Sequence, residues 1–150
     1  MTSLRLLSVI ALSALTLPGC GGGGSPRDVV FGSTPAEALV RTRGAPVLTR
    51  ASDLRPGSTV QWFRDSSSCQ SEGGAVVACA REPRGAETAL QYWRHLLKEE
   101  RTEYLAIPES RDPHGNPQRQ LVAPARGVTV VYDRALGRVV RVTEYGPVSR

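Results

Sequence analysis

The sequence predicts an α+β domain in which two helices pack on one face of a small antiparallel sheet of three to five strands. Helix signals lie at 34–44 and 86–104, and the segment 59–63 between them is rich in β-branched and aromatic residues, as strands are. Near the carboxyl end, two further β-branched runs at 127–132 and 138–145 flank a short segment that contains a glycine, which is typical of a β-hairpin.

The amino end has the anatomy of a secretory signal, with a charged start and an apolar run that ends at Leu17-Pro18-Gly19-Cys20. This run is shorter than the roughly 20 residues that a membrane-spanning helix needs. Its last four residues resemble a bacterial lipobox, which predicts cleavage before Cys20 and acylation of its thiol and amine. Residues 1–19 are therefore the expected signal peptide, 20–27 the lipidated cysteine with a glycine-rich tether, and 28–150 a single periplasmic domain.

The first helix has clear start and stop signals. Thr34 is expected to be the N-cap, Pro35 suits the first helical position, and Glu37 completes a capping box. Gly44 favours a C-terminal stop, and Pro46 prevents the helix from continuing. This helix is therefore expected to be short.

Two strands are expected on either side of the polar stretch 64–74, at 59–63 and 75–79. Because the periplasm is oxidising, a disulfide is the default for the two cysteines that do not carry lipid, Cys69 and Cys79. A regular hairpin across 64–74 would hold Cys69 near its tip, away from Cys79, so the bond requires the loop to fold back or the second strand to start late.

A metal site would need more ligands at suitable spacing. The two histidines fall in unrelated contexts, His95 in the second predicted helix and His114 in a loop rich in proline and glycine. The sequence therefore predicts a disulfide rather than a metal site, and no cofactor.

The second helix, 86–104, carries an apolar stripe at near-helical spacing. The residues of this stripe are Leu90, Trp93, Leu97 and Tyr104. The glutamates at 99, 100 and 103 occupy the other face without a partner nucleophile or histidine, so a solvated face is expected there rather than acid–base chemistry.

The remainder of the chain reads as a surface loop followed by β structure. Three prolines and a Gly-Asn pair mark 107–118 as the loop. A strand is expected at 120–122, and the residues 133–137 link the two hairpin strands. The sequence shows no internal repeats.

The chain of 150 residues carries 19 Lys and Arg against 14 Asp and Glu, a formal net charge of +5. A basic surface favours contact with anionic lipid or peptidoglycan. The arginines are scattered among acidic residues and form no cluster interleaved with aromatics, so nucleic-acid binding is not expected.

Several motifs together resemble those of the SmpA/OmlA (BamE-like) family of outer-membrane assembly lipoproteins. They are Gly32-Ser33-Thr34, Gly44-Ala45-Pro46, the Trp62-Phe63 pair and the closing hairpin 128–142. The resemblance implies a small helical layer on a three-stranded antiparallel sheet, and a role beside the machinery that assembles outer-membrane β-barrels. The disulfide loop and the helix 86–104 look like an insertion into that pattern.

The expected function is that of a non-enzymatic accessory or scaffold in outer-membrane assembly or maintenance. The protein would be held on the outer membrane by the lipid on Cys20, would face the periplasm, and would contact envelope assembly proteins. An enzyme is not expected, because no Ser/His/Asp, Cys/His or metal arrangement is visible. The alternative is a periplasmic binding or enzyme-inhibitor lipoprotein, for which the disulfide loop 64–80 would be the contact segment.

Overall fold

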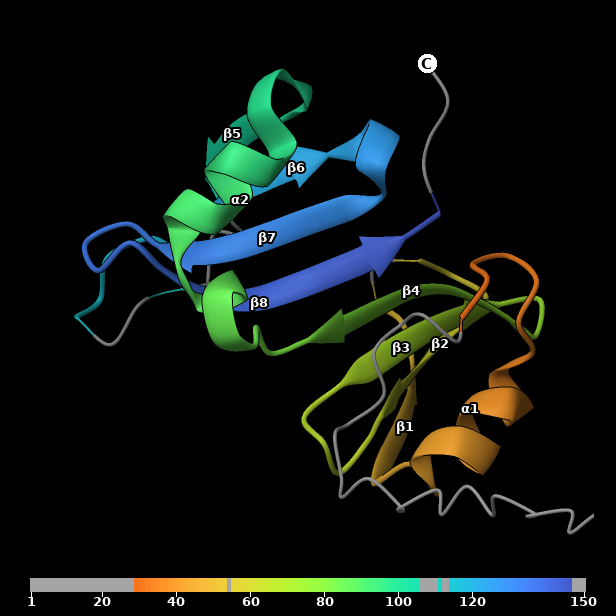
Figure 1. Ribbon diagram of the computed structural model, residues 1–150. Helices are drawn as coiled ribbons and strands as arrows, with labels where there is room; N and C mark the ends of the chain where they lie inside the picture. The colour runs from red at the N-terminus through yellow and green to blue at the C-terminus, as the bar shows by residue number, and fades with distance from the viewer. Residues whose placement is uncertain (1–28, 54, 106–110, 112–113, 147–150) are drawn as a thin grey trace, which may run out of the picture.

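The computed structural model describes residues 29–53, 55–105, 111 and 114–146. They form one antiparallel sheet of eight strands in the order β1-β2-β3-β4-β8-β7-β6-β5, with two short α-helices (Figure 1). In chain order the elements are α1 (Ala36–Arg43), β1 (Leu48–Ala51), β2 (Ser58–Trp62), β3 (Ser68–Glu72), β4 (Ala75–Arg81), the 3₁₀ helix η2 (Gly85–Thr88), α2 (Leu90–Leu97), η3 (Lys98–Glu100), β5 (Thr102–Leu105), β6 (Arg119–Ala123), η4 (Pro124–Arg126), β7 (Val128–Asp133) and β8 (Arg138–Tyr145).

The predicted fold class is wrong, because the domain is mostly β rather than a helical layer on three to five strands. The prediction missed three strands, β1, β3 and β5, which are four or five residues long. These strands are polar or mixed in composition, so they lack the β-branched runs that marked the others. The eight-stranded sheet also contradicts the three-stranded sheet that the resemblance to the SmpA/OmlA family implied.

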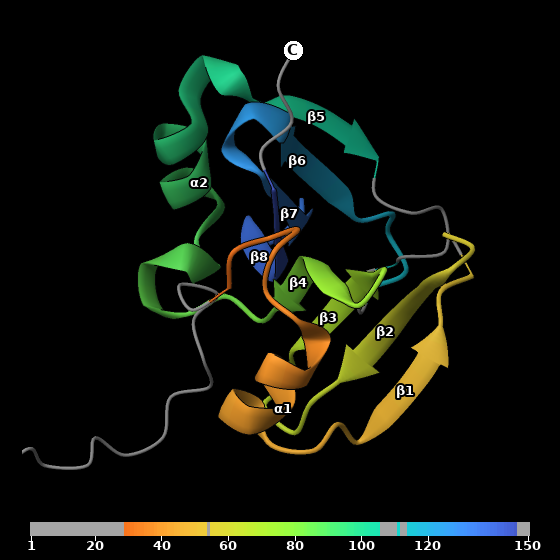
Figure 2. The same ribbon diagram turned by 90° about the vertical axis from the view of Figure 1, so that its right-hand side faces the viewer.

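The fold repeats one arrangement twice, which the sequence did not indicate. In each half a short α-helix is followed by four strands that pair in chain order, α1 with β1–β4 and α2 with β5–β8. The last strands of the two halves, β4 and β8, pair antiparallel at the centre of the sheet. Figure 2 shows α1 beside the first half and α2 beside the second.

Each half has its own buried core. The core of the first half consists of Leu39, Phe63, Cys69, Val76 and Cys79. The larger core of the second half consists of Leu90, Trp93, Leu97, Leu121, Ala123, Val128, Val130, Tyr132, Val139 and Val142. Burying each large side chain stabilises the fold by about 1.5–3 kcal/mol before the entropy cost of ordering it. The boundary between the two cores lies where β4 meets β8.

The first helix starts later than predicted. It begins at Ala36 with Pro35 in the N-cap position, and no side chain caps it. The Thr34 hydroxyl instead accepts a hydrogen bond from the Val30 N–H at 2.8 Å, which stabilises the turn before the helix. The predicted capping box is therefore absent. The predicted end of the helix at Gly44 is confirmed, since this glycine has a φ of +81° after the last helical turn.

The second helix is shorter than the predicted 86–104. A 3₁₀ turn occupies 85–88, α2 ends at Leu97, and Lys98 has a positive φ of 44° that breaks the helix. The stripe of Leu90, Trp93 and Leu97 is buried as expected. Tyr104 matched the helical spacing by coincidence, and it lies in strand β5.

The structure contains the predicted Cys69–Cys79 disulfide, with a Cα–Cα distance of 4.1 Å. Cys69 lies within strand β3, directly opposite Cys79 in β4, because these strands form a hairpin closed at Gly73 and Gly74. The segments 59–63 and 75–79 do not pair directly, since β3 lies between them, and the polar stretch folds back as the disulfide requires. Segment 64–80 is mostly sheet rather than a protruding loop.

No helix in the described part of the chain is long and apolar enough to cross a membrane. The predicted signal peptide, Cys20 and the tether to residue 27 lie outside the described residues.

Candidate functional site

A cleft of about 460 Å³ lies at the boundary between the two cores. Its floor comes from the ends of β4 and β8 and from η2, which supply Arg81, Glu144 and Glu87. One wall is formed by α2 and another by the turn that contains Phe31. Cleft volumes of a few hundred Å³ are typical of small-molecule sites.

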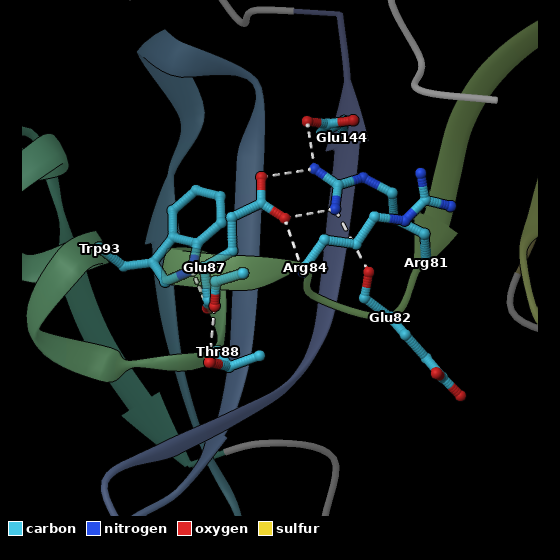
Figure 3. A network of polar contacts seen from close by, with 8 residues as sticks. Arg81, Glu82, Arg84, Glu87, Thr88, Trp93 and Glu144 are labelled. Atoms are coloured by element: carbon cyan, nitrogen blue, oxygen red, sulfur yellow. Dashed lines mark hydrogen bonds and ion pairs between the residues drawn. The ribbon is translucent and has the colours of Figure 1, made fainter. Parts of the chain in front are cut away.

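The floor is an ion network centred on Arg81 (Figure 3). The Arg81 guanidinium donates two hydrogen bonds to the Glu87 carboxylate, at 2.6 and 2.9 Å, and a longer one of 3.4 Å to Glu144. Glu87 also accepts a hydrogen bond from the backbone N–H of Arg84, and its own carbonyl accepts one from the Trp93 indole N–H. The network therefore fastens β4 and β8 to the turn before α2.

The two carboxylates of the network differ electrostatically. The hydrogen bonds from Arg81 hold the pKa of Glu87 below its ordinary value and raise the pKa of Arg81. Burial raises the pKa of Glu144, and the neighbouring charge of Glu87 adds to the rise. The Arg81 guanidinium is thus shared by the carboxylates of Glu87 and Glu144. Because it binds Glu87 more closely, it compensates the charge of Glu144 less well.

The pleat of the sheet explains why Glu144 is on the floor of the cleft. A cross-strand row on the buried face runs through Cys69, Cys79, Glu144, Val128 and Ala123. All of these residues except Glu144 are buried apolar side chains. Two buried atoms of this network, Nε of Arg81 and Oε2 of Glu144, lack a hydrogen-bond partner within the protein, and such unpaired buried atoms are energetically costly.

The walls of the cleft are apolar and partly exposed. Tyr92 and Leu96 lie four residues apart on α2, next to its buried stripe, and are 40% and 44% exposed. Phe31 and Tyr145 line the cleft from other elements. At the rim, the Arg126 guanidinium is paired with the Glu100 carboxylate. The cleft therefore combines apolar walls with a charged floor.

The opposite side of the pleat presents a second candidate surface, which we name the open face. It is a cross-strand row that crosses all eight strands: Leu48, Trp62, Ser68, Ala80, Thr143, Thr129, Val122 and Thr102. No residue of this row is buried, in contrast to the row on the other face. Its central members are small, and the larger Trp62 and Val122 lie toward the two ends.

Two arginines extend the open face, since side chains two positions apart point to the same side of a strand. Arg50 lies two residues from Leu48, and Arg141 lies two residues from Thr143; both are exposed. Glu72, which follows Gln70 on the same side of β3, is paired with Arg55 at 2.6 Å. The open face therefore carries a positive charge excess.

The residues singled out in the sequence are scattered in the structure. His95 is exposed on α2 and His114 lies in a separate loop. Within the described residues, no three His, Cys, Asp or Glu side chains are placed to hold a metal ion. Two of the three glutamates expected on a solvated helix face have side-chain partners, because Glu100 binds Arg126 and Glu103, which lies in strand β5, accepts a hydrogen bond from the buried Tyr132 hydroxyl.

Sequence reasoning missed the cleft altogether, because Arg81, Glu87 and Glu144 belong to different elements. One signal was available in the predicted strand 138–145. Alternation places Glu144 on the same side as Val142, so a carboxylate follows the apolar positions of the buried face. The same holds for Arg81 after Cys79 in β4.

Comparison of the chain with protein-family models, with curated proteins and with solved structures found no match in any of the three.

Proposed function

We propose that this protein is a lipid-anchored accessory or scaffold of the cell envelope, which works by binding other envelope proteins and not by catalysis. The observation that carries the proposal is the open face, an unburied row of side chains that crosses all eight strands. The predicted lipid on Cys20 supplies the membrane attachment, on the periplasmic side of the outer membrane.

The size of the open face supports a protein partner. Eight strands about 4.8 Å apart span roughly 38 Å, and strands of five residues are about 17 Å long, which gives on the order of 600 Å². A standard protein interface uses about 800 Å² from each partner. The open face with its immediate surroundings therefore supplies an interface of ordinary size.

The chemistry of the open face indicates what kind of partner surface it fits. An aromatic side chain, Trp62, lies near one end of the row, and aromatic residues are enriched at interfaces. Arg50 and Arg141 make the surface positive, so an acidic partner surface is favoured. Proteins of outer-membrane assembly remain our proposed partners, on the basis of the expected anchor and the motifs shared with the SmpA/OmlA family.

The alternative, a binding or inhibitor lipoprotein, receives support in one of its two forms. The inhibitor form required segment 64–80 to be an exposed rigid loop, whereas most of this segment forms β3 and β4 inside the sheet. The binding form is favoured by the cleft around Arg81.

Co-purification from mild detergent extracts tests the scaffold proposal. The double variant Arg50→Glu/Arg141→Glu reverses the charge of the open face, and the control Arg41→Glu/Arg134→Glu makes the same charge change at exposed positions elsewhere. We expect the tagged wild type and the control to recover outer-membrane assembly proteins, and the open-face variant to lose them. Equal recovery with both variants would contradict the proposal.

A further inference from the structure

We propose that the cleft between the two halves is a binding site for a primary ammonium group carried on an apolar chain. This inference does not depend on the scaffold proposal, because it concerns the other side of the sheet and a different class of ligand. It rests on the charge of the floor, the character of the walls and the position of Glu144.

The charge of the floor favours a cation. Arg81 contributes one positive charge, whereas Glu87 and Glu144 contribute two negative charges. The Arg126 charge at the rim does not redress this excess, because Glu100 neutralises it. Among the side chains that line the cleft, one negative charge is therefore in excess, while Arg84 and Arg43 act on Glu87 and Glu144 from outside the lining. A cation that enters the cleft would compensate Glu144 without disturbing the two short bonds between Arg81 and Glu87.

The position of Glu144 leaves it available to a ligand. Its side chain is 26% exposed and lines the cleft, and its bond to Arg81 is the longest of the network at 3.4 Å. Its Oε2 atom has no hydrogen-bond partner. Because Oε2 is itself buried, a ligand would reach it through rotation of the carboxylate, and an ammonium donor forms strong charge-assisted hydrogen bonds there.

The walls favour an ammonium group with an apolar body over an inorganic cation. Phe31 and Tyr92 bring aromatic rings to the cleft, and aromatic faces attract cations. Leu96 and Tyr92 leave apolar surface exposed on α2, which a hydrocarbon chain would cover. Hydrated metal ions gain nothing from such walls, and no cluster of three acidic or metal-ligating side chains occurs among the described residues.

The charged groups that act on Glu144 come from three elements. Arg81 lies on β4 and Glu87 on η2, while Arg43 acts from α1 at longer range. Because binding requires the ionised form of Glu144, affinity for an amine should fall as the pH is lowered, and it should do so at a higher pH than an ordinary carboxylate would give.

The test compares three probes that share one chain length, n-pentylamine, 1-pentanol and pentanoate, by NMR titration of the full-length protein in detergent micelles. We expect saturable shifts around Tyr92 and Leu96 with pentylamine, and binding at least about tenfold weaker with the alcohol and the acid. Equal binding of the three probes, or no saturation by pentylamine up to roughly 50 mM, would overturn the proposal.

Two variants test whether pentylamine binds in the cleft. Glu144→Gln should weaken pentylamine binding about tenfold and remove its pH dependence, whereas Glu99→Gln, an exposed carboxylate outside the cleft, should leave it unchanged. Leu96→Ala leaves the ion network intact and should weaken binding several-fold through the apolar wall alone. Unchanged affinity in both Glu144→Gln and Leu96→Ala would refute the assignment.

Two kinds of ligand carry a primary ammonium group on an apolar chain, namely free amines and the lysine side chains of peptides. A capped Leu-Lys-Leu peptide and 1,5-diaminopentane distinguish them, with a Leu-Gln-Leu peptide as the neutral control. Tighter binding of the lysine peptide than of the diamine assigns the cleft to a peptide segment, and the reverse assigns it to a free polyamine. Equal affinity for the lysine and glutamine peptides would contradict an ammonium site for peptides.

Discussion

Arg81 and Glu87 form a two-bonded ion pair, at 2.6 and 2.9 Å, that joins the last strand of the first half to the turn before α2. The side chains are 11% and 23% exposed, so the pair is shielded from solvent. Because β4 is also the strand that pairs with β8, this contact ties the two halves of the fold together at their boundary.

Removing the charge of Glu87 should therefore destabilise the whole fold. Glu87→Gln leaves the buried Arg81 guanidinium with a weaker partner, and we expect a loss of about 2 kcal/mol in the free energy of unfolding. Urea denaturation followed by tryptophan fluorescence measures this loss. The control Glu82→Gln alters an exposed neighbour and should change stability by less than about 0.5 kcal/mol. Equal effects of the two variants would show that the ion pair is not structural.

The stability of the protein should depend on pH in two opposite ways. Burial raises the pKa of Glu144 above its unfolded value, so its contribution is full at low pH and is lost as the pH rises through the raised pKa. The pKa values of Glu87 and Glu103 are lowered by hydrogen bonds from Arg81 and Tyr132, so their contributions are lost as the pH falls through the lowered values.

The free energy of unfolding should consequently rise as the pH falls from neutral toward the ordinary carboxyl pKa of 4.5, and should decrease below it. Glu144→Gln should remove the rise and keep the acid-side decrease. Urea unfolding across this pH range provides the measurement. A rise that persists in Glu144→Gln would mean that another group causes it.

The disulfide should stabilise the fold by constraining the unfolded chain. Cys69 and Cys79 are ten residues apart, and both side chains are buried in the core of the first half. Replacing both by alanine should lower the free energy of unfolding by about 3 kcal/mol. Alkylation of the denatured, unreduced protein should label neither of these cysteines. Stoichiometric labelling without reductant would show that the bond does not form.

Part of the fold follows from local sequence and part does not. Gly44 ends α1 and the stripe at Leu90, Trp93 and Leu97 places α2, because these signals act within one element. Strand β3 carries Ser-Cys-Gln-Ser-Glu, which has no β-branched residue, and its neighbours in the sheet impose its conformation. The edge strand β1 is fully exposed, so it shows no alternation of burial.

The candidate site was harder to foresee than the fold. Arg81 and Glu144 lie 63 positions apart and meet only because β4 pairs with β8. The arrangement of α1 with β1–β4 is repeated by α2 with β5–β8 only in the order in which the strands pair. The side chains of the two halves differ, so the sequence does not reveal the repeat. Neither relation leaves a periodic pattern in the sequence.

The predicted lipid anchor is tested at one residue. Cys20→Ala removes the thiol that the lipobox presents, so the protein should leave the membrane fraction and should no longer incorporate labelled palmitate. The variant Ser25→Ala, in the tether, should remain in the membrane fraction and stay labelled. Labelling of the Cys20→Ala variant would place the acylation elsewhere.

Crosslinking in intact cells tests most directly whether the open face contacts envelope proteins. A photo-crosslinking residue at Thr143 sits at the centre of the open face, and one at Leu136, which is 59% exposed in the β7–β8 hairpin, serves as the control. We expect Thr143 to capture outer-membrane assembly proteins, identified by mass spectrometry, and Leu136 to capture none of them. Capture of a single hydrolase at Thr143, or of the same proteins from both positions, would contradict the scaffold function.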